Sequence, residues 1–472
     1  MTLATTAAAR CPALLIAAPA SGQGKTTVTA ALARLHARQG RRVRVFKCGP
    51  DFLDPFWHQL ASGAPVHNVD LWMTGEADIR ARLHAAAGEA DVLLVEGVMG
   101  LHDGTPSAAD LARRFGLPVL AVVQAGAMAQ TLGAVVHGLR HYKEDSNGRL
   151  PWAGVLANGV ASAGHAALLQ GAVDPPEGWL GHLPRSAAMQ LPERYLGLVA
   201  AHELGQDAAL ARLDAAADLL AATPLGALTL DDWRARWAVA FAAPAAGDAD
   251  AVPPLLAGRT VAVARDAAFA FIYPANVATL QALGARVVFF SPLAGDALPE
   301  CDALWLPGGY PELHAAALAA RSDLRSALHR HAADGKPIWA ECGGMMALFE
   351  ELVTADGAAH AMWGLLPGRT TMQKKLAGLG MQAWAAAADA PPLRGHSFHY
   401  SVCDTPLAPV GRTTPAPGSA RREGEAVYVG GPRGAVRGSY FHAWLASSPR
   451  AAVRLFSSGI GAGSACSKGD QP

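Results

Sequence analysis

The stretch Ala18-Pro19-Ala20-Ser21-Gly22-Gln23-Gly24-Lys25-Thr26-Thr27 decides the fold of the first half of the chain. The apolar run Ala13–Ala18 leads into it, and a helical pattern, Thr26–Arg38, follows it. A strand that passes through a Gly-rich turn into a helix is the context of an ATP-phosphate loop, because backbone N–H groups converge on an anion at the helix N-terminus. Pro19 stands where the general G-x-x-x-x-G-K-[ST] pattern has its first Gly, so a Gly-rich turn without nucleotide stays open.

Short apolar runs alternate with helical patterns through the first half of the chain. Strands separated by helices predict a parallel sheet that is covered by helices. The stretch Asp207–Ala222 has apolar residues at helical spacing and predicts a further helix at the domain edge. The expected strands are Ala13–Ala18, Val43–Lys47, Val92–Glu96, Val119–Gln124 and Gly154–Asn158.

A Pro-, Ala-, Gly- and Asp-rich segment, Phe241–Gly258, predicts a linker. A second alternation of strands follows it, which predicts a second α/β domain. The expected strands there are Val261–Ala264, Val287–Ser291, Leu304–Pro307 and Ile338–Glu341. We therefore expect an α/β protein with a phosphate-loop domain at 1–240, a linker at 241–258, a second domain at 259–450 and a disordered tail at 451–472.

Composition excludes several classes of protein. Lys plus Arg number 39 and Asp plus Glu also number 39, so a net charge of zero gives no reason to expect a nucleic-acid or membrane-surface partner. The six cysteines form no Cys-x-x-Cys pair, which argues against a zinc site or a disulfide framework and favours the cytoplasm. The N-terminal apolar run enters the phosphate loop, so we reject a cleaved signal peptide. No apolar run approaches the roughly 20 residues that span a bilayer.

The phosphate loop supplies most of the expected ATP ligands. Gly22 and Gly24 let the backbone approach the phosphates, and Lys25 is placed to reach the β- and γ-phosphates. The Thr26 hydroxyl is a candidate Mg²⁺ ligand, and Thr27 is expected to bind phosphate beside it.

Charged residues at the ends of the next strands complete the predicted nucleotide site. Lys47 is placed to neutralise phosphate and Asp51 to bind Mg²⁺, although a helix-capping Asp in a solvated loop would give the same sequence. Glu96 ends a buried strand, where a carboxylate without a metal would be costly, so we expect it to hold Mg²⁺ directly or through water.

Five further residues near the same sheet edge are candidates for ligand contact. Asp54 lies in the loop after Lys47, together with His58, and is a candidate for the substrate. His102 and Asp103 follow Glu96 in a loop and are candidates for the substrate too, with a capping role for Asp103 equally open. Asn158 ends a strand and is expected to contact ATP at the adenine, with a turn residue as the alternative.

The second domain carries a candidate cysteine nucleophile. Cys342 follows the apolar run Pro337–Glu341 and precedes two glycines, a strand-to-helix turn that exposes the thiol. The N–H of Gly343 is placed to stabilise an oxyanion, and Gly309, in the turn Leu306–Glu312, is expected to supply a second donor. His442 follows an apolar run near the end of this domain and is the candidate base.

These features resemble the cobyrinic acid a,c-diamide synthase family, including its hydrogenobyrinic acid-using members. The resemblance covers the chain from about Ala13 to Trp444. It is carried by the motifs Ser21–Thr27, Gly49–Pro55, Val95–Gly100, Leu191–Leu198, Ala264–Phe269, Leu306–Glu312, Glu341–Gly344 and Phe398–Ser401.

The resemblance implies an N-terminal ATP-dependent amide-ligase domain similar to dethiobiotin synthetase and a C-terminal class I glutamine amidotransferase domain. It implies that Cys342 and His442 are the nucleophile and the base. Many glutaminases of this class place a Glu two residues after the His, where this chain has Trp444. The implied reaction amidates the a and c acetates of a corrinoid acid in cobalamin biosynthesis, through acyl phosphates, with ATP and glutamine as substrates and Mg²⁺ as cofactor. A homodimer is the expected assembly.

Three alternatives remain at this point. Cobyric acid synthase resembles the chain in both domains, although the Asp51–Pro55 and Phe398–Ser401 motifs favour the a,c-diamide enzymes. Nickel-tetrapyrrole a,c-diamide synthase is another relative. A non-catalytic phosphate-loop assembly protein would not need Cys342 or His442.

Arg369, Lys374 and Lys375 fit a solvated basic face better than a substrate contact.

Overall fold

The computed structural model describes residues 8–194, 197–198, 205–245, 253–419 and 421–457. Contacts divide the chain into two compact units, Met1–Asp250 and Ala251–Pro472. The predicted linker contains this division, and its residues 246–252 lie outside the described residues, as do 195–196 of the Leu191–Leu198 motif and 458–472 of the predicted tail.

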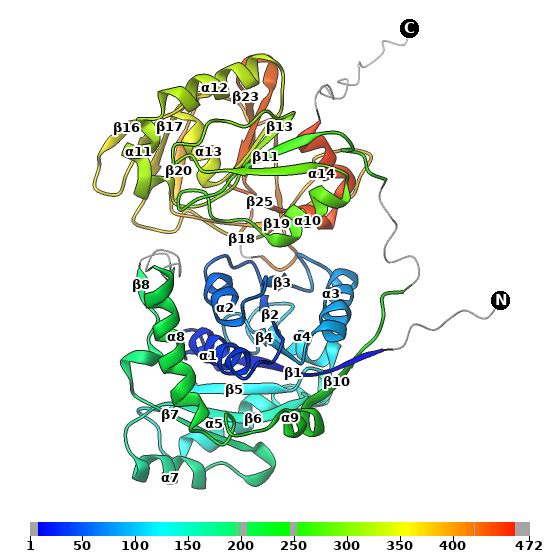
Figure 1. The fold of residues 1–472 in the computed structure, drawn as a ribbon, viewed down its shortest axis with the longest axis vertical. Coiled ribbons are helices and arrows are strands. Elements are labelled where there is room, and N and C mark those ends of the chain that lie inside the picture. Colours follow the sequence, from blue (N-terminus) through cyan, green and yellow to red (C-terminus); the bar gives the residue numbers. More distant parts are fainter. Residues whose placement is uncertain (1–7, 195–196, 199–204, 246–252, 420, 458–472) are drawn as a thin grey trace, which may run out of the picture. The chain divides into compact units, whose positions relative to one another are not determined.

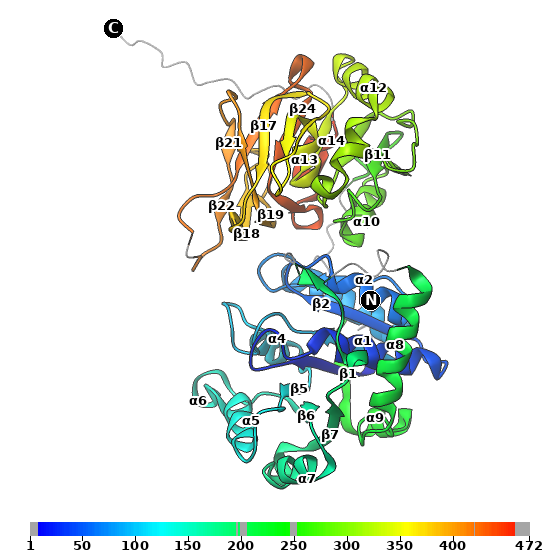
Figure 2. The same ribbon diagram turned by 90° about the vertical axis from the view of Figure 1, so that its left-hand side faces the viewer.

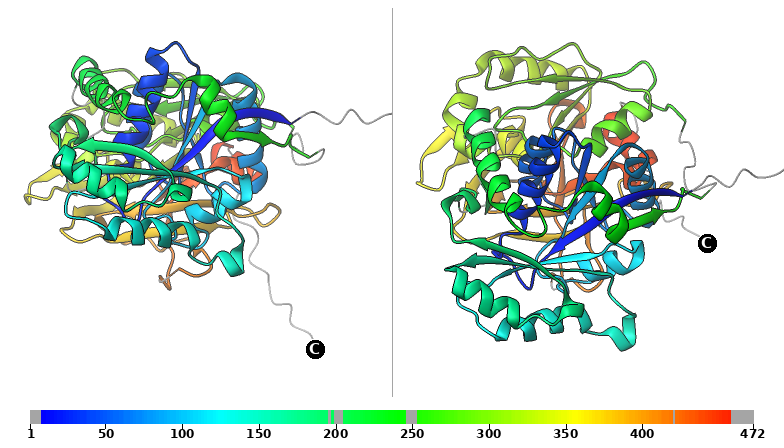
Figure 3. Two further views of the ribbon diagram at one scale, coloured as in Figure 1. Left: turned by 90° about the horizontal axis from the view of Figure 1, so that it is seen from below. Right: turned by 60° about the horizontal axis from the view of Figure 1, so that its bottom comes forward.

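The first unit is built on an eight-stranded sheet in the order β3-β2-β4-β1-β5-β6-β7, with β10 paired to β1. All neighbours along β3 to β7 are parallel, which confirms the expected parallel sheet. Among the described strands of this sheet, β10 alone runs antiparallel, beside β1 (Figure 3). The strands are β1 (Ala9–Ala17), β2 (Val43–Cys48), β3 (His67–Val69), β4 (Val92–Glu96), β5 (Val119–Gln124), β6 (Trp152–Val160), β7 (Trp179–Pro184) and β10 (Ala238–Phe241), with a separate pair β8 (Glu193–Arg194) and β9 (Gly197–Leu198).

Helices cover both faces of this sheet (Figure 1, Figure 2). Because side chains alternate along a strand, Leu14 and Ile16 of β1 pack with α1, α2, α8 and α9, whereas Ala13 and Leu15 pack with α3 and α4. The helix expected at 207–222 is α8, which is tied to α1 by the Arg34–Asp214 ion pair. The helices are α1 (Lys25–Arg38), α2 (Asp54–Ser62), α3 (Glu76–Glu89), α4 (Ala108–Phe115), α5 (Thr131–His141), α6 (Glu144–Asn147), α7 (Ala163–Gly171), α8 (Gln206–Ala221) and α9 (Leu230–Trp237), with short turns η1 (Pro175–Glu177) and η2 (Ala187–Met189).

The second unit has a seven-stranded sheet in the order β12-β11-β13-β14-β24-β23-β21 and two four-stranded sheets, β16-β15-β17-β20 and β22-β18-β19-β25. The pairs from β12 to β24 are parallel, so their carboxyl ends share one edge. The strands are β11 (Thr260–Ala264), β12 (Arg286–Phe290), β13 (Ala303–Leu306), β14 (Ile338–Glu341), β15 (Phe349–Val353), β16 (Ala359–Ala361), β17 (Leu366–Met372), β18 (Gly378–Trp384), β19 (Leu393–His399), β20 (Ser401–Asp404), β21 (Gly411–Arg412), β22 (Thr414–Pro415), β23 (Ala426–Gly430), β24 (Val436–Ser439) and β25 (His442–Trp444).

Two hydrophobic cores lie on opposite faces of the large sheet. Ala262 and Leu304 pack with α11, α12 and α13, whereas Val261 and Trp305 pack with α10 and α14. The helices are α10 (Pro274–Ala282), α11 (Ala315–Ala319), α12 (Ser322–Ala333), α13 (Gly343–Leu348) and α14 (Pro449–Phe456), with short turns η4 (Pro311–His314), η5 (Pro432–Gly434) and η6 (Leu445–Ser447).

The ends of both units depart from the expected boundaries. We expected a disordered tail from residue 451, but residues 451–456 are helical, because α14 buries Ala451, Ala452, Leu455 and Phe456 against the second unit. Phe241, the first residue of the predicted linker, is the buried last residue of β10.

Among the described residues, no helix has both the length and the apolar character to cross a bilayer.

Candidate active sites

The phosphate loop connects β1 to α1 at the carboxyl edge of the first sheet. Gly22 and Gly24 have φ angles of 74° and 93°, in the left-handed region that glycine tolerates best. A Cβ on Gly24 would overlap the side-chain amide of Asn158, which donates from Nδ2 to the Gln23 carbonyl at 3.0 Å. Asn158 therefore braces the loop from the end of β6, a role that the sequence did not indicate.

Lys25 begins α1 and lies inside the loop. Its Nζ donates to the carbonyls of Ala20 at 3.1 Å and Met99 at 2.6 Å, so the ammonium is held near the N-terminus of α1. Burial lowers the pKa of Lys25, although Glu96 opposes this shift. Thr27, in the first turn of the same helix, is buried.

Glu96 is the centre of the charged cluster at this edge. It ends β4, is fully buried, and accepts hydrogen bonds from Thr26 Oγ1 at 2.8 Å and from Lys47 Nζ at 3.0 Å. Its second carboxylate oxygen pairs with Nε2 of His58. Burial raises the pKa of Glu96, but Lys47 and His58 outweigh burial and hold it below the usual value. The lowered pKa favours the ionised form of Glu96, which a ligand of Mg²⁺ has to adopt, and its metal role stays a prediction.

Lys47 links two further carboxylates to this cluster. Its Nζ lies 2.5 Å from Asp54 Oδ2 and 3.7 Å from Asp51 Oδ2. Burial and the neighbouring Asp51 raise the pKa of Asp54 well above its usual range. Asp51 also accepts from the backbone N–H groups of Leu53 and Asp54, at 2.8 and 3.1 Å, which is the capping role that the sequence left open.

This donor set fits Mg²⁺. The Thr26 hydroxyl and the carboxylates of Asp51, Asp54 and Glu96 are oxygen donors of the kind that this ion prefers. Burial, and then the neighbouring Asp51, raise the pKa of Asp54, and the charge of a bound divalent cation would favour its ionised form. The residues present are therefore compatible with the expected ion.

Three residues that the sequence assigned to loops were less well defined by it. His58 lies four residues after Asp54 on α2, a helical spacing that puts both side chains on the face toward Glu96. Asp103 accepts from the Gly100 N–H at 2.7 Å within the loop after β4, whereas the N-cap of the next helix, α4, is Ser107. The Nε2 atom of His102 lies 2.8 Å from the Leu139 carbonyl, so this ring contacts α5 in the described structure.

Cys342 occupies a strained turn between β14 and α13. Its φ of 46° and ψ of −108° are rare for a residue with a side chain, and strain of this kind is found at functional sites. A Cβ on Gly343 would stand 3.0 Å from the backbone N of Gly309, so the two expected oxyanion donors lie in adjoining segments. Burial raises the pKa of the Cys342 thiol, and Glu312 adds to this shift, so the thiol needs a base.

His442 begins β25 beside the same turn. A Cβ on Gly308 would overlap the His442 ring, so the glycine before Gly309 makes room for the imidazole. The ring stacks on His396, with 4.9 Å between ring centroids. Burial, then His396 and His399, lower the pKa of His442 well below its usual value, which leaves a neutral imidazole that is able to accept a proton.

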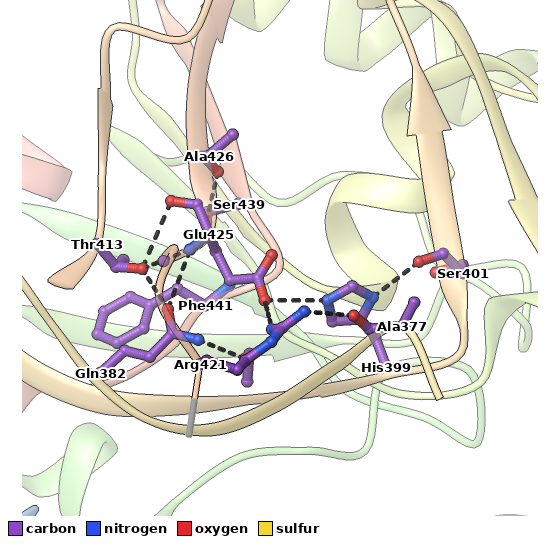
Figure 4. Close-up of polar contacts among 12 residues, drawn as sticks. Ala377, Gln382, His399, Ser401, Thr413, Arg421, Glu425, Ala426, Ser439 and Phe441 are labelled. Atoms are coloured by element: carbon purple, nitrogen blue, oxygen red, sulfur yellow. Dashed lines mark hydrogen bonds and ion pairs between the residues drawn. The ribbon is translucent and has the colours of Figure 1, made fainter. Parts of the chain in front are cut away.

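A partly buried polar cluster near this turn was not predicted. Figure 4 shows the Glu425 carboxylate between His399 and Arg421. Its Oε1 lies 3.2 Å from His399 Nε2 and accepts from Arg421 Nη1 at 2.8 Å. The His399 ring stacks on Tyr440 at 3.7 Å, two residues before His442. The only sequence signal was His399, within the Phe398–Ser401 motif.

Arg369, Lys374 and Lys375, which were expected to form a solvated basic face, lie on the surface. Arg369 pairs with Asp404 at 3.6 Å, with 56% of its side chain exposed, and Lys374 and Lys375 are exposed.

Comparison with known proteins matches both halves of the chain. A nucleotide-binding domain described as CobQ/CobB/MinD/ParA matches residues 14–198, and a CobB/CobQ-like glutamine amidotransferase domain matches residues 260–450. Hydrogenobyrinate a,c-diamide synthase of Stutzerimonas stutzeri is 54% identical over 94% of this chain and 98% of the relative. The enzyme of the same name from Pseudomonas aeruginosa is 52% identical over 95% and 98%. Cobyrinate a,c-diamide synthase of Herminiimonas arsenicoxydans is 48% identical over 94% and 96%.

The chain belongs to the a,c-diamide synthase family. As a member of that family it is an enzyme, a glutamine-hydrolysing carbon–nitrogen ligase with a nucleotide-binding domain and an amidotransferase domain. A solved glutamine amidotransferase matches 42% of this chain and 96% of its own chain at 18% identity, with a TM-score of 0.28.

Proposed function

We propose that this a,c-diamide synthase amidates the a and c acetate carboxylates of hydrogenobyrinic acid or cobyrinic acid, with ATP and glutamine, in cobalamin biosynthesis. The observation that carries the proposal is the presence on one chain of a phosphate loop with its acid cluster and of a cysteine turn with its histidine. The relatives support the substrate, since they are named for hydrogenobyrinate and for cobyrinate.

The first unit activates the carboxylate. Ammonia does not attack a carboxylate anion at a useful rate, so ATP first converts it to an acyl phosphate. Lys25 and Lys47 offset the negative charge that builds on the transferred phosphoryl group, and Gly22, Gly24 and Thr27 hold the phosphates through the loop and the start of α1. When Mg²⁺ is bound, with Thr26, Asp51 and Glu96 as its holders, it adds electrostatic stabilisation of the phosphates.

The remaining candidates at this edge have narrower roles. Asn158 keeps the loop in its phosphate-binding shape, because its amide fixes the Gln23 carbonyl. Asp54, His102 and Asp103 lie in the segments after β2 and β4 and are proposed to face the corrinoid acid.

The second unit releases ammonia from glutamine. His442 takes the thiol proton of Cys342, and the thiolate attacks the side-chain amide of glutamine. The N–H groups of Gly343 and Gly309 stabilise the resulting oxyanion, and His442 returns the proton to the leaving ammonia. Water then releases glutamate, and the ammonia displaces phosphate from the acyl phosphate. Two rounds give the diamide.

The conditions of this activity are part of the proposal. We propose Mg²⁺ as the cofactor, a cytoplasmic location and a homodimer. Light scattering of the purified protein checks the dimer, and removal of Mg²⁺ by a chelator should stop synthesis.

Mass spectrometry of the products tests the proposed function. The reaction contains ATP, Mg²⁺, glutamine and either hydrogenobyrinic or cobyrinic acid. A mass change that matches two carboxylate-to-amide conversions and stops there is expected, and the acid that reacts reveals whether the ring carries cobalt. Absence of product from both acids, while glutamine is still hydrolysed, would overturn the proposed substrate.

A Cys342→Ala variant tests the division of labour between the units. It should lose synthesis with glutamine by more than about 100-fold, because the nucleophile is gone, and keep synthesis with added ammonium salt. Product formation with each nitrogen source is the measurement. Loss of both activities in a folded variant would contradict separate sites.

A further inference from the structure

The base of the glutaminase lacks the carboxylate that the class usually places two residues after it. That position is Trp444, whose fully buried indole packs edge-on against Tyr273 with 5.0 Å between ring centroids. A neutral imidazole gains from a carboxylate partner, because the partner fixes its tautomer and stabilises the imidazolium that forms during the reaction. An acid that contacts His442 from another element would serve the same purpose.

Glu341 is such an acid. It is the last residue of β14, directly before the nucleophile, and only 1% of it is exposed. Its Oε1 accepts from Trp339 Nε1 at 2.8 Å and from the Ala443 N–H at 3.2 Å. Ala443 follows His442 on β25, so this carboxyl group is anchored to the strand that carries the base.

The second oxygen of Glu341 points toward that base. Oε2 lies 4.0 Å from Nδ1 of His442, and both side chains are buried. Hydrogen bonds of catalytic groups are often long without substrate and shorten when substrate binds. The anchoring of Oε1 leaves Oε2 as the atom that can approach the imidazole.

We propose that Glu341 is the positioning residue of the glutaminase, whose Oε2 accepts the Nδ1–H of His442 and leaves Nε2 as the atom that takes the proton of the Cys342 thiol. This inference rests on the proposed glutaminase role of Cys342 and His442. The thiol proton moves to Nε2, the imidazolium then carries both ring protons, and Glu341 remains a carboxylate. The Nε2 proton later passes to the leaving ammonia, which restores neutral His442.

The environment of Glu341 makes this arrangement sensitive to pH. It faces the indoles of Trp339 and Trp305, the Ala443 N–H and His442, and His442 in turn faces His396 and His399. Burial raises the pKa of Glu341 to about 8. A protonated Glu341 would donate to Nδ1 and leave a proton on Nε2, the wrong tautomer for a base. Glutaminase turnover should therefore rise with pH as Glu341 ionises.

A Glu341→Gln variant of the full-length enzyme tests the proposal, with release of glutamate from glutamine as the measurement. The Gln carbonyl can still accept from Trp339 and Ala443, so the fold is retained, while its amide cannot accept from Nδ1. We expect kcat to fall about 100-fold or more with KM within about threefold, and the rising limb near pH 8 to disappear. Synthesis from ammonium salt should be unchanged. Glu423→Gln, at a largely exposed carboxylate of the same unit, is the matched control and should behave as wild type.

Three outcomes would overturn this assignment. They are a wild-type kcat, an unchanged pH profile, or an equal loss of glutamine- and ammonia-dependent activity, which marks a purely structural role. If the Gln variant does not fold, the Glu341→Asp variant tests the proposal instead. Its shorter carboxylate should keep the rise of glutaminase turnover with pH, while kcat falls about tenfold. A wild-type kcat in this variant would refute the proposal. Glutamate release measures the activity of this site even if both corrinoid acids fail as substrates. A wrong substrate can therefore be distinguished from a wrong role for Glu341.

Discussion

The contact between Gly24 and Asn158 restricts which residues the phosphate loop can contain. Gly24 faces the Asn158 amide so closely that a Cβ would overlap it, and the same amide holds the Gln23 carbonyl. The loop therefore depends on a residue that is more than 130 positions away in the sequence. An adenine contact by Asn158 stays a prediction, but its bond to the loop gives a reason for its position.

Asn158→Ala removes this bond. Loss of one hydrogen bond of about 1 kcal/mol should raise the KM for ATP about fivefold, because the loop is less ordered before phosphate binds. Steady-state kinetics of synthesis measure this change, and glutamine hydrolysis, which takes place in the other unit, is the control. An unchanged KM would show that the loop does not need this brace.

At the scale of elements, the amidotransferase unit holds its cysteine turn with backbone rather than with side chains. Gly343 and Gly344 leave no room for Cβ atoms, which would meet the backbone of Gly309 and of Leu306, so the start of α13 lies directly on the end of β13 and the turn that follows it. The polar cluster of His399, Arg421 and Glu425 joins β19 to the segment before β23 in the same unit (Figure 4).

The pH dependence of stability should report this cluster. Burial raises the pKa of Glu425, but hydrogen bonds and charge from His399, Ser397 and Arg421 bring it down to about 2. Its usual value is about 4.3 in an unfolded chain. A folded pKa below the unfolded one stabilises the protein above the unfolded value, and this stability is lost as pH falls from about 4.3 to about 2.

Glu425→Gln should therefore destabilise the second unit by about 2–4 kcal/mol at pH 7, since a largely buried, paired charge is removed. Calorimetric melting at several pH values measures the gap between wild type and variant, which should narrow below about pH 4. A gap of the same size at pH 7 and near pH 2 would mean that the Glu425 carboxylate does not carry this stability.

At the scale of the whole molecule, the two units carry separable chemistry. Each has its own sheet, its own cores and its own candidate residues. A substitution at the candidate site of one unit should therefore affect mainly the half-reaction that takes place in that unit.

Lys25→Ala is the counterpart of the cysteine variant. Synthesis from glutamine and from ammonium salt should both fall about 100-fold or more, because the charge on the transferred phosphoryl group is no longer offset. Glutamine hydrolysis should persist at a reduced or equal rate. Product and glutamate are measured in the same reaction, and full synthesis by this variant would remove the phosphate-loop assignment.

Much of the fold followed from local pattern. The five strands expected in the first unit are present, with ends that differ by up to four residues, because β1 is extended back to Ala9 by its antiparallel pairing with β10. The phosphate loop and the cysteine turn were predicted because glycines and chemically distinctive residues lie close together in the sequence. Helix α14 was missed, since its amphipathic face has meaning only against the core that it covers.

The sequence by itself determined the two α/β units and the family, because each depends on short motifs with their own local geometry. The same motifs predict Lys25, Glu96, Cys342 and His442 as site residues. Only the tertiary structure decided which partners those residues have. His58 reaches Glu96 and Glu341 approaches His442 because strand ends and helices that are distant in sequence meet at one edge of a sheet. Such pairings depend on strand order and register, which no local pattern encodes.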